Sequence, residues 1–498
     1  MLKNRKFLVL LMMSLVTLTA LAQENLSLQG CRRGTPRPES SYPLLRRGGS
    51  EGRIPGGDFY HGERHQLTVL VAFNDRLFVG DESATMEQWN KIFNTKNLTE
   101  EPFKGSVHDY FYDQSYGDFS LVFDLEYVQV SGNAKKYAST EVDDENSQYL
   151  VEDIMEELNT RDIDWSRYDW DGNGYVNQLL IVYAGHGMND YSGNDLIWPH
   201  QWWMSEHLKD RQPGVYCDPI PVSYGGKKYM VDCYCALAEL TSNNDYGSFG
   251  TICHEFTHCF GFPDFYNGST KYVAGWDLMD YGNYNGDGYL PAGYSAHERM
   301  LMGWLTPIEL KDKKSIVDMP ALSETGEAYL IRNDGWENEY YIVENRQAVS
   351  WDSGLPGSGV MVFHIDYDPS IWTSTKEYTN TSSKQRYVLF HANNTKAVYG
   401  KWGYPYLDND SLTNYSSPVA TLNNENSDGT KLMNKSLRDI AVAGGLASFR
   451  FTVDSSTGID ELKAEGEPRE LYRIGPVSIL RYPNGVVRKV VRAKSTKD

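Results

Sequence analysis

The sequence predicts an α+β fold in two parts: a twisted sheet packed with helices, followed by a β-sandwich-like domain. Up to about residue 305, buried apolar runs such as HQLTVLVAFND (65–75) and QLLIVYAG (178–185) alternate with segments of helical periodicity. After Pro307, short stretches of alternating apolar and polar residues dominate, such as NEYYIVENRQ and GVMVFHIDYD, and these are typical of all-β domains. A chain of 498 residues is long enough for more than one domain.

The helices and strands of the first part follow from local patterns. Residues 106–130 (SVHDYFYDQSYGDFSLVFDLEYVQV) predict a short helix, a turn at Gly117 and then a strand. The apolar positions of residues 147–158 recur at helical spacing and predict an amphipathic helix. Further helices are expected at about residues 249–260 and 294–305.

The N-terminal residues are typical of an export signal. A basic start, MLKNRK, precedes an apolar run that ends in Ala20-Leu21-Ala22, a small-x-small cleavage site. The alternative is a membrane anchor, but the apolar run is short for one. Lipidation of Cys31 is a second alternative, although this residue lies well past the apolar run. We therefore expect a secreted or cell-surface protein.

Composition indicates the domain boundaries. The segment between the signal and about residue 62 is rich in Arg, Gly, Pro and Ser, which is typical of a linker or a pro-segment. A Ser-Ser-Thr-Gly break at 455–458 precedes a tail that turns basic. The predicted organisation is a signal peptide at 1–22, a pro-segment or linker at 23–62, an α+β domain at 63–305, a β-rich domain at 306–454 and a tail at 455–498.

Overall composition excludes some classes of protein. The chain is 40% hydrophobic and 13% aromatic, which indicates a folded protein. A net charge of -20 argues against nucleic-acid binding through phosphate contacts. Six cysteines are few for an exported chain of this length, so no dense disulfide framework is implied. The central cysteines are expected to be buried thiols, one of which could bridge to Cys217.

The segment ICHEFTHCFGFPDFY, which begins at Ile252, has the pattern of a zinc site. His254 and His258 are four residues apart, so on a helix they share a face and can bind one metal ion. Glu255 is placed to reach a water on that metal and to take its proton during attack on a carbonyl. The His-Glu-x-x-His motif of metalloproteases assigns the same roles to its two histidines and its glutamate.

The residues after the histidines strengthen this interpretation. Gly261 stands where the helix must stop and the chain must turn. Asp264 can then supply a third ligand from another direction and leave the fourth position open for water. The alternative is a helix with two core histidines that are satisfied by hydrogen bonds. That alternative does not account for the glutamate, glycine and aspartate together.

Further motifs resemble those of a known family. WDLMDYGNYNGDG (276–288) follows the zinc motif, and the stretches FNDRLF, IWPHQW and PAGYSAHERMLMGWL occur in the order of the immune inhibitor A family of secreted zinc metallopeptidases. Residues 63–370 are similar to that family. The family's long zinc motif and Met-turn resemble those of the metzincins. The resemblance therefore implies a zincin or metzincin-like catalytic domain at 63–305, in which a twisted sheet accompanies the active-site helix.

The resemblance also implies roles for individual residues. Glu255 matches the general base, and Met279 matches the residue in the turn beneath the metal. Tyr281 lies two residues past Met279 and could donate a hydrogen bond to the oxyanion, the alternative being an ordinary packed tyrosine. The zinc ligands match three residues of the motif, namely His254, His258 and Asp264.

A second metal site is predicted at DWDGNGYVN (169–177). Oxygen-bearing side chains alternate before Gly174, as in the first half of an EF-hand loop. The second half is missing, because Leu180 stands where a bidentate Glu is required. The alternative is a plain turn before a strand. The predicted structural calcium ligands are Asp169, Asp171, Asn173, the Tyr175 carbonyl and Asn177.

Two terminal features suggest further hypotheses. The tail from Gly458 resembles a divergent C-terminal sorting segment of the type IX secretion system, the alternative being a basic, solvated terminus. Cys31 could cap the zinc in a latent form, because a thiolate is a good zinc ligand.

These patterns predict an exported zinc endopeptidase that acts on protein or peptide substrates and carries a structural calcium ion. One alternative is an adhesin that keeps the metallopeptidase fold and binds through its tyrosine-rich β domain. The intact Glu255 speaks against it, since a pure binding protein has no need of that carboxylate. A zinc amidase that acts on a non-protein substrate is a third class. No pattern in the sequence indicates the oligomeric state.

Overall fold

The computed structural model describes most of the chain between residues 60 and 454. The signal peptide and nearly all of the expected pro-segment lie outside the described residues. The described ranges are 60–138, 146–189, 195–206, 218–247, 249–372, 378–395 and 402–454, with residues 191 and 193 and the backbone of short strands at 31–32, 216–217, 469–474, 477–481 and 487–491.

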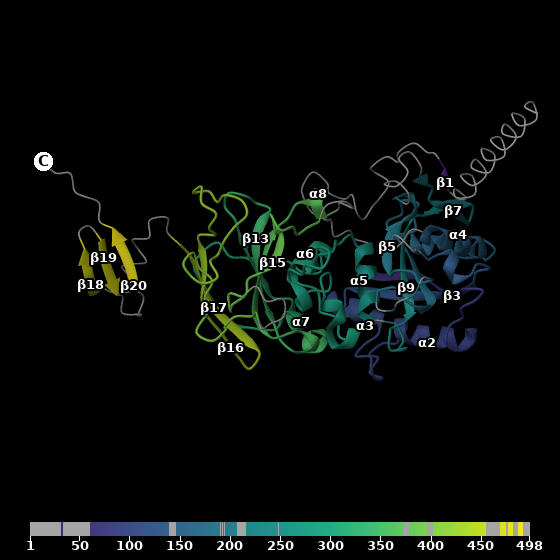
Figure 1. Cartoon of the computed structure of the whole chain (residues 1–498), viewed down its shortest axis with the longest axis horizontal. Helices are drawn as coiled ribbons and strands as arrows, with labels where there is room; N and C mark the ends of the chain where they lie inside the picture. Colours follow the sequence, from purple (N-terminus) through teal and green to yellow (C-terminus); the bar gives the residue numbers. More distant parts are fainter. Residues whose placement is uncertain are drawn as a thin grey trace, which may run out of the picture.

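The first part of the chain is built on a five-stranded sheet with the strand order β3-β2-β4-β9-β5. The four strands from β3 to β9 are parallel, whereas β5 is antiparallel to β9 and forms an edge. Figure 1 shows β5 and β9 next to the helix α5. The bounds of the strands are β2 (Gly62–Ala72), β3 (Phe119–Gln129), β4 (Leu179–His186), β5 (His200–Trp203) and β9 (Cys233–Leu240).

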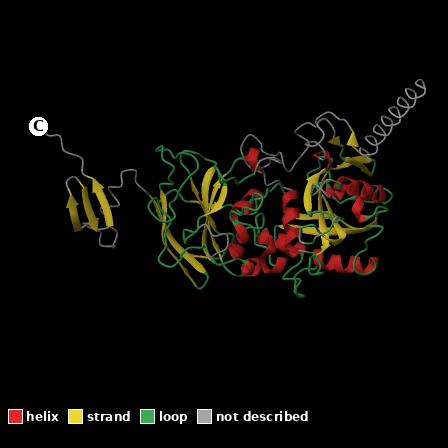
Figure 2. Ribbon diagram, in the orientation of Figure 1, coloured by secondary structure: helices red, strands yellow, loops and turns green. Residues whose placement is uncertain are grey.

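Helices cover both faces of this sheet (Figure 2). Successive side chains of β2 point to opposite faces, so Leu70 packs with the helices α2, α3 and α5, whereas Val69 and Val71 pack with α4. The helices are α2 (Glu82–Asn94), α3 (Val107–Gln114), α4 (Ser147–Leu158), α5 (Phe249–Cys259) and α6 (Ala296–Met302).

Local signals set the ends of these helices. Ser106 caps α3 in a capping box with Asp109, and Ser295 caps α6 in the same way with Glu298. Helix α6 ends at Met302 because Gly303 adopts a left-handed φ of 81°. The predicted helix at 294–305 is therefore shorter in the structure, while α4 has the predicted bounds.

Short elements connect the main ones in this part of the chain. The sheet of β1 and β6 places Cys31 opposite Cys217 in its register, and β7 and β8 form a hairpin. These elements are β1 (Cys31–Arg32), η3 (Ala134–Lys136), η4 (Trp165–Tyr168), η5 (Met204–Glu206), β6 (Tyr216–Cys217), β7 (Ile220–Tyr224), β8 (Lys227–Val231), η6 (Ala274–Trp276) and η7 (Gly282–Gly288).

The chain after Pro307 is rich in strands, as its alternating apolar and polar residues predict. A five-stranded sheet has the order β10-β12-β13-β14-β15, and a three-stranded sheet has the order β11-β17-β16. The elements are β10 (Ile308–Glu309), β11 (Lys314–Met319), α7 (Leu322–Thr325), β12 (Ala328–Arg332), β13 (Glu339–Arg346), η8 (Ser350–Gly354), β14 (Gly359–Asp366), α8 (Pro369–Trp372), β15 (Tyr387–Leu389), β16 (Lys435–Ala443) and β17 (Leu446–Val453).

The larger of these two sheets contributes to two cores. From one face, residues such as Val343 and Val362 pack with Phe449 of the smaller sheet. From the other face, residues such as Ile342 and Phe363 belong to the same core as α5 and α6. The strand-rich part is therefore packed against the helical part through a shared apolar core, and β13 lies beside α6 (Figure 1).

Buried charges reinforce this contact. The Arg346 guanidinium on β13 is buried, pairs with Glu344 and Asp352, and donates a hydrogen bond to the carbonyl oxygen of Gly293, just before α6. The Asp352 carboxylate also accepts from the Gly293 N–H. Because each charge has partners, the segment before α6 is fixed on the strand-rich part without an unpaired buried ion.

The C-terminal tail contains three short strands in one antiparallel sheet. They are β18 (Arg469–Ile474), β19 (Val477–Arg481) and β20 (Val487–Val491). Among the helices within the described ranges, none has the length and apolar character needed to cross a bilayer.

Candidate metal centre and active site

Helix α5 carries both histidines of the motif on one face. His254 and His258 are one turn apart, and their imidazole centres are separated by 4.9 Å. The helix ends at Cys259, and Gly261 adopts a φ of 95°, which favours glycine at this turn. The turn brings Asp264 Oδ1 to 3.1 Å from His254 Nε2 and 3.3 Å from His258 Nε2. The three predicted metal ligands therefore lie together.

Backbone carbonyls orient both imidazole rings. His254 Nδ1 lies 2.8 Å from the Leu278 carbonyl oxygen, and His258 Nδ1 lies 2.7 Å from the Phe262 carbonyl oxygen. A carbonyl oxygen only accepts hydrogen bonds, so in each neutral ring Nδ1 carries the hydrogen and Nε2 directs a lone pair at the site. Metal-bound histidines typically have such outer hydrogen bonds, which fix the tautomer and the ring orientation.

The two separations from Asp264 Oδ1 fit a tetrahedral metal ion. With metal–ligand bonds of about 2.0–2.1 Å, two ligand atoms of a tetrahedron lie about 3.3 Å apart, and the observed separations of 3.1 Å and 3.3 Å agree with this value. Asp264 Oδ1 is buried and accepts no hydrogen bond. Within the described ranges, no other His, Cys, Asp and Glu side chains form a group of three close enough to share a metal ion.

The electrostatics of the site favour a positive charge between the ligands. Burial lowers the pKa of His258, but the Asp264 carboxylate outweighs burial and raises this pKa to about 9. Burial also lowers the pKa of His254, but the Asp264 and Glu255 carboxylates together raise it above its usual value. Burial raises the pKa of Asp264, yet the two histidines lower it below the usual range. A metal ion would supply this positive charge in place of a proton.

Glu255 lies beside the three ligands and is partly exposed. Burial raises the pKa of its carboxyl group, although both histidines act in the opposite direction. A carboxylate of raised pKa that is open to solvent next to a metal site has the properties of a general base. The position of Glu255 on α5, directly after His254, fixes it relative to the ligands.

The predicted turn beneath the metal is held by two aspartates. Met279 is fully buried, and its backbone N–H donates to Asp277 Oδ1 at 2.8 Å. Asp280 Oδ2 accepts from three consecutive backbone N–H groups, those of Tyr272, Val273 and Ala274, at 2.8–2.9 Å. These bonds fix the loop whose Leu278 carbonyl accepts from His254, so the aspartates act on the metal site through that carbonyl.

A tyrosine that the sequence analysis did not single out lies closer to the ligands than Tyr281. The Tyr266 hydroxyl is hydrogen-bonded to Asp264, and burial with the nearby Asp264 and Glu255 carboxylates raises its pKa well above the usual range. Its ring stacks near His254, with centres 6.4 Å apart. Tyr281 packs against Tyr266 at 5.9 Å, and the Lys271 ammonium group lies 3.3 Å from its ring centre. Tyr281 is thus one aromatic layer further out.

The predicted calcium loop forms a compact turn. Asp169 Oδ2 accepts from the Gly174 N–H at 3.0 Å, and Asp171 Oδ2 accepts from the Asn173 side-chain amide at 3.0 Å. Asn173 Oδ1 accepts from the Tyr175 N–H, and Asn177 Oδ1 from the Trp170 N–H, at 2.8 Å and 2.6 Å. These hydrogen bonds to the side-chain oxygens all come from within the loop. Calcium binding at this loop stays a prediction.

Three further histidines have hydrogen-bond partners away from the metal ligands. His186 Nδ1 is bonded to the Thr241 carbonyl, and His200 contacts the Trp198 carbonyl and the Tyr234 hydroxyl. His364, in the strand-rich part, lies 2.7 Å from Glu339.

Four central cysteines are buried free thiols, as expected: Cys233, Cys235, Cys253 and Cys259. A bridge to Cys217 and a zinc cap by Cys31 concern side chains outside the described part of the chain.

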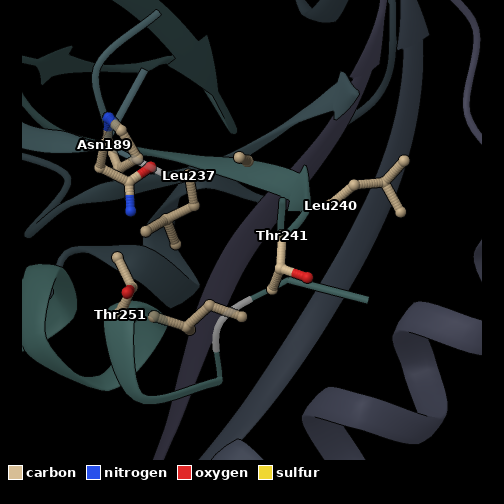
Figure 3. A pocket seen from close by; sticks show the side chains of 8 residues that line it. Asn189, Leu237, Leu240, Thr241 and Thr251 are labelled. Atoms are coloured by element: carbon tan, nitrogen blue, oxygen red, sulfur yellow. The ribbon is translucent and has the colours of Figure 1, made fainter. Parts of the chain in front are cut away.

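A small cavity of about 10 Å³, the space of one water molecule, lies near the first half of α5 (Figure 3). It is lined by Thr251 and Ile252 of α5, by Leu237 of β9, and by Asn189 and Thr241. Thr251 is one helical turn before Glu255, so the cavity lies on the side of α5 that faces the sheet, one turn from the predicted general base.

Comparison with known proteins finds the family that the sequence motifs resemble. Residues 68–303 match the immune inhibitor A peptidase M6 catalytic domain. The chain is 25% identical to "Immune inhibitor A" of Bacillus thuringiensis subsp. alesti over 254 residues, which are 45% of this chain and 34% of that relative. The aligned stretch therefore spans about a third of the relative's length.

The fold is a mixed α/β domain in which three potential metal ligands lie together. Within it, residues 68–303 are similar to the catalytic domain of the immune inhibitor A peptidases, and this confirms the resemblance predicted from the motifs.

Proposed function

We propose that this protein is an exported zinc endopeptidase. The observation that carries the proposal is the convergence of His254 Nε2, His258 Nε2 and Asp264 Oδ1 at the spacing of a tetrahedral metal site, in a region similar to immune inhibitor A peptidases. Glu255, on the same helix, completes the set of groups that peptide hydrolysis requires.

Two histidine nitrogens and one carboxylate suit zinc, because borderline-soft Zn²⁺ binds imidazole and carboxylate in catalytic sites with three protein ligands. His254, His258 and Asp264 would hold the ion, and zinc would lower the pKa of a water molecule and polarise the substrate carbonyl. The carbonyls of Leu278 and Phe262 keep both Nε2 atoms deprotonated and directed at the ion.

Proton transfer falls to Glu255. Its carboxylate takes a proton from the attacking water and then delivers it to the departing amine. The raised pKa of this group suits both steps, because the protonated form is more readily populated than for an ordinary glutamate. Tyr281 would donate a hydrogen bond to the oxyanion, and Tyr266 would keep Asp264 in place.

The edge strand β5 offers a place for an extended substrate. Within the described residues β5 pairs only with β9, and it contacts α5. A peptide that adds to an exposed sheet edge gains main-chain hydrogen bonds without a sequence requirement. Such binding would hold protein or peptide substrates across the metal ligands of α5.

The remaining parts of the chain have supporting roles in this proposal. Residues 306–454 would form a sandwich-like domain that stabilises the catalytic domain at 63–305, and the 169–177 loop would take a structural calcium ion. The signal peptide at 1–22 would direct export. The tail at 455–498 would be read by a type IX secretion machinery, so that the mature enzyme is secreted or displayed at the cell surface.

The test of the metal requirement is hydrolysis of casein by the purified protein. We expect activity to be abolished by a chelator and restored by stoichiometric zinc, with metal content measured in each sample. Full activity in a sample from which zinc, and every other divalent metal, has been removed would contradict the proposal.

A further inference from the structure

Three buried cysteines gather where α5 meets the sheet. Cys259 is the last residue of α5, and its sulfur lies 4.0 Å from that of Cys233 at the start of β9. Cys235 lies two residues further along the same face of β9. All three side chains lie in the apolar core between β9 and α5. The contact therefore joins the sheet to the helix that carries both histidines.

This cluster lacks the features of a catalytic or metal-binding cysteine site. Cys233 and Cys259 are both buried, so neither thiol is accessible as a nucleophile in the folded protein. The cysteines also do not belong to the cluster of potential metal ligands found in the described part of the chain. A covalent bond between the two sulfurs is the remaining chemistry that their contact permits.

We propose that Cys233 and Cys259 form a disulfide bond when the exported chain folds, and that this bond ties the end of the active-site helix to β9. The inference rests on the proposed export, since disulfides persist in oxidising compartments. A disulfide has a sulfur–sulfur bond of about 2.05 Å, so the two atoms must approach by about 2 Å.

The bond forms by exchange with a disulfide donor, such as oxidised glutathione or an oxidoreductase. The thiolate of one cysteine attacks a donor sulfur, forming a mixed disulfide and expelling one donor thiolate. The second cysteine's thiolate then attacks the protein sulfur of that mixed disulfide and expels the other donor thiolate. The two protein thiols lose two electrons and two protons, and the donor disulfide gains them as two thiols. Exchange must precede the burial of α5 against β9, because the buried thiols are inaccessible afterwards.

The position of the bond gives it a function. Cys259 directly follows His258 and precedes the Gly261 turn that returns the chain to Asp264. A link from this point to β9 fixes the helix end at which the ligand set is closed. It also closes the long loop from Cys233 to Cys259, which restricts the unfolded chain. The oxidised protein should therefore keep its metal-binding geometry under conditions that loosen the reduced protein.

The experiment is peptide mapping of the exported full-length protein. Free thiols are alkylated under denaturing conditions without reduction, and the protein is digested at low pH to prevent exchange. We expect one cross-linked species that contains Cys233 and Cys259 and separates on reduction, with Cys235 and Cys253 alkylated. Alkylation of all four thiols would overturn the proposal, and so would a bond that joins Cys259 to Cys235 instead. This readout is independent of peptidase activity, so it is unaffected if the proposed function is wrong.

Thermal unfolding supplies a second measurement. Reductant should lower the Tm of the oxidised wild type by about 5 °C or more. Cys259→Ser should lower the Tm and make it insensitive to reductant. Cys253→Ser changes another buried thiol of the same helix and should keep the full response to reductant. A wild-type Tm that reductant does not change would contradict the structural role.

Discussion

At the scale of single residues, the metal site is organised by hydrogen bonds that leave one side of each imidazole free. The Nδ1 atoms of His254 and His258 bond to carbonyls, so both Nε2 atoms face Asp264. The spacing of the motif predicts that these three residues meet. The Leu278 and Phe262 carbonyls could not be predicted, because backbone acceptors leave no trace in the identity of a residue.

Substitutions of the two tyrosines near the ligands should affect different properties, one the rate of hydrolysis and the other the binding of zinc. Tyr281→Phe is expected to lower kcat by at least about tenfold with bound zinc unchanged, because it removes a donor to the oxyanion. Tyr266→Phe is expected to weaken metal binding by about tenfold, because it removes the hydrogen bond to Asp264. Casein hydrolysis and zinc titration of both variants separate the two effects. An unchanged kcat in Tyr281→Phe would refute the oxyanion role.

His297 should make the protein sensitive to acid. It is fully buried, its Nε2 has no hydrogen-bond partner, and burial lowers its pKa to about 3. The unfolded chain has a histidine pKa of about 6.5, so between these two values only the unfolded state takes up the proton. Stability is therefore lost as the pH falls below about 6.5, by roughly 2 kcal/mol between pH 7 and pH 5.

The variant His297→Asn isolates this contribution. Its amide keeps an acceptor for the Tyr340 hydroxyl, which lies 3.2 Å from His297 Nδ1, but it does not titrate. Urea unfolding of both proteins at pH 7 and pH 5 should show a pH dependence that is smaller in the variant by about 2 kcal/mol. An equal pH dependence in the two proteins would mean that His297 can be protonated in the folded state.

At the scale of elements, the turn beneath the metal depends on Asp280, whose Oδ2 accepts three backbone N–H groups. Asp280→Ala leaves these donors without their acceptor and should lower the free energy of unfolding by roughly 2–4 kcal/mol. The variant should also bind zinc more weakly, because the loop that orients His254 is loosened. The measurements are urea unfolding and zinc affinity. Unchanged zinc affinity would show that the turn does not position the ligand.

The elements themselves were predictable where a local pattern determines them. The helix at 147–158 has the predicted bounds because its apolar positions recur at helical spacing, and Gly117 turns the chain with a φ of 84°. Helix α2 was not predicted, because few of its residues are apolar, and of those Trp89, Ile92 and Phe93 are buried. Tyr266 was also missed, since only the tertiary fold decides that its hydroxyl meets Asp264.

At the scale of the whole molecule, the two parts of the chain depend on each other. Trp351, after β13, is stacked on Phe249 at the start of α5 with ring centres 5.6 Å apart, and its indole N–H donates to Asp113 at 2.8 Å. The shared core could not be predicted from the sequence. The pattern of apolar and polar residues changes at Pro307 and indicates where the strands begin. It does not indicate which face of the sheet meets the helices.

Removal of the Trp351 side chain should weaken the entire protein. Trp351→Ala leaves a large cavity between the two parts and is expected to lower the free energy of unfolding by roughly 3–5 kcal/mol. Trp336→Ala is the matched control, because Trp336 is 51% exposed, and its effect should stay within about 0.5 kcal/mol. Urea unfolding measures both. Equal stability of the two variants would mean that the contact around Trp351 does not hold the parts together.

The most direct test of the central claim concerns Glu255. Casein hydrolysis would be compared for the wild type and Glu255→Ala, with the zinc content of each protein determined. We expect both proteins to hold zinc and the variant to lose activity by a factor of about 100 or more, because the metal ligands remain and the general base is gone. A zinc-loaded Glu255→Ala variant that hydrolyses casein as fast as the wild type would contradict the assignment of this site as the catalytic centre.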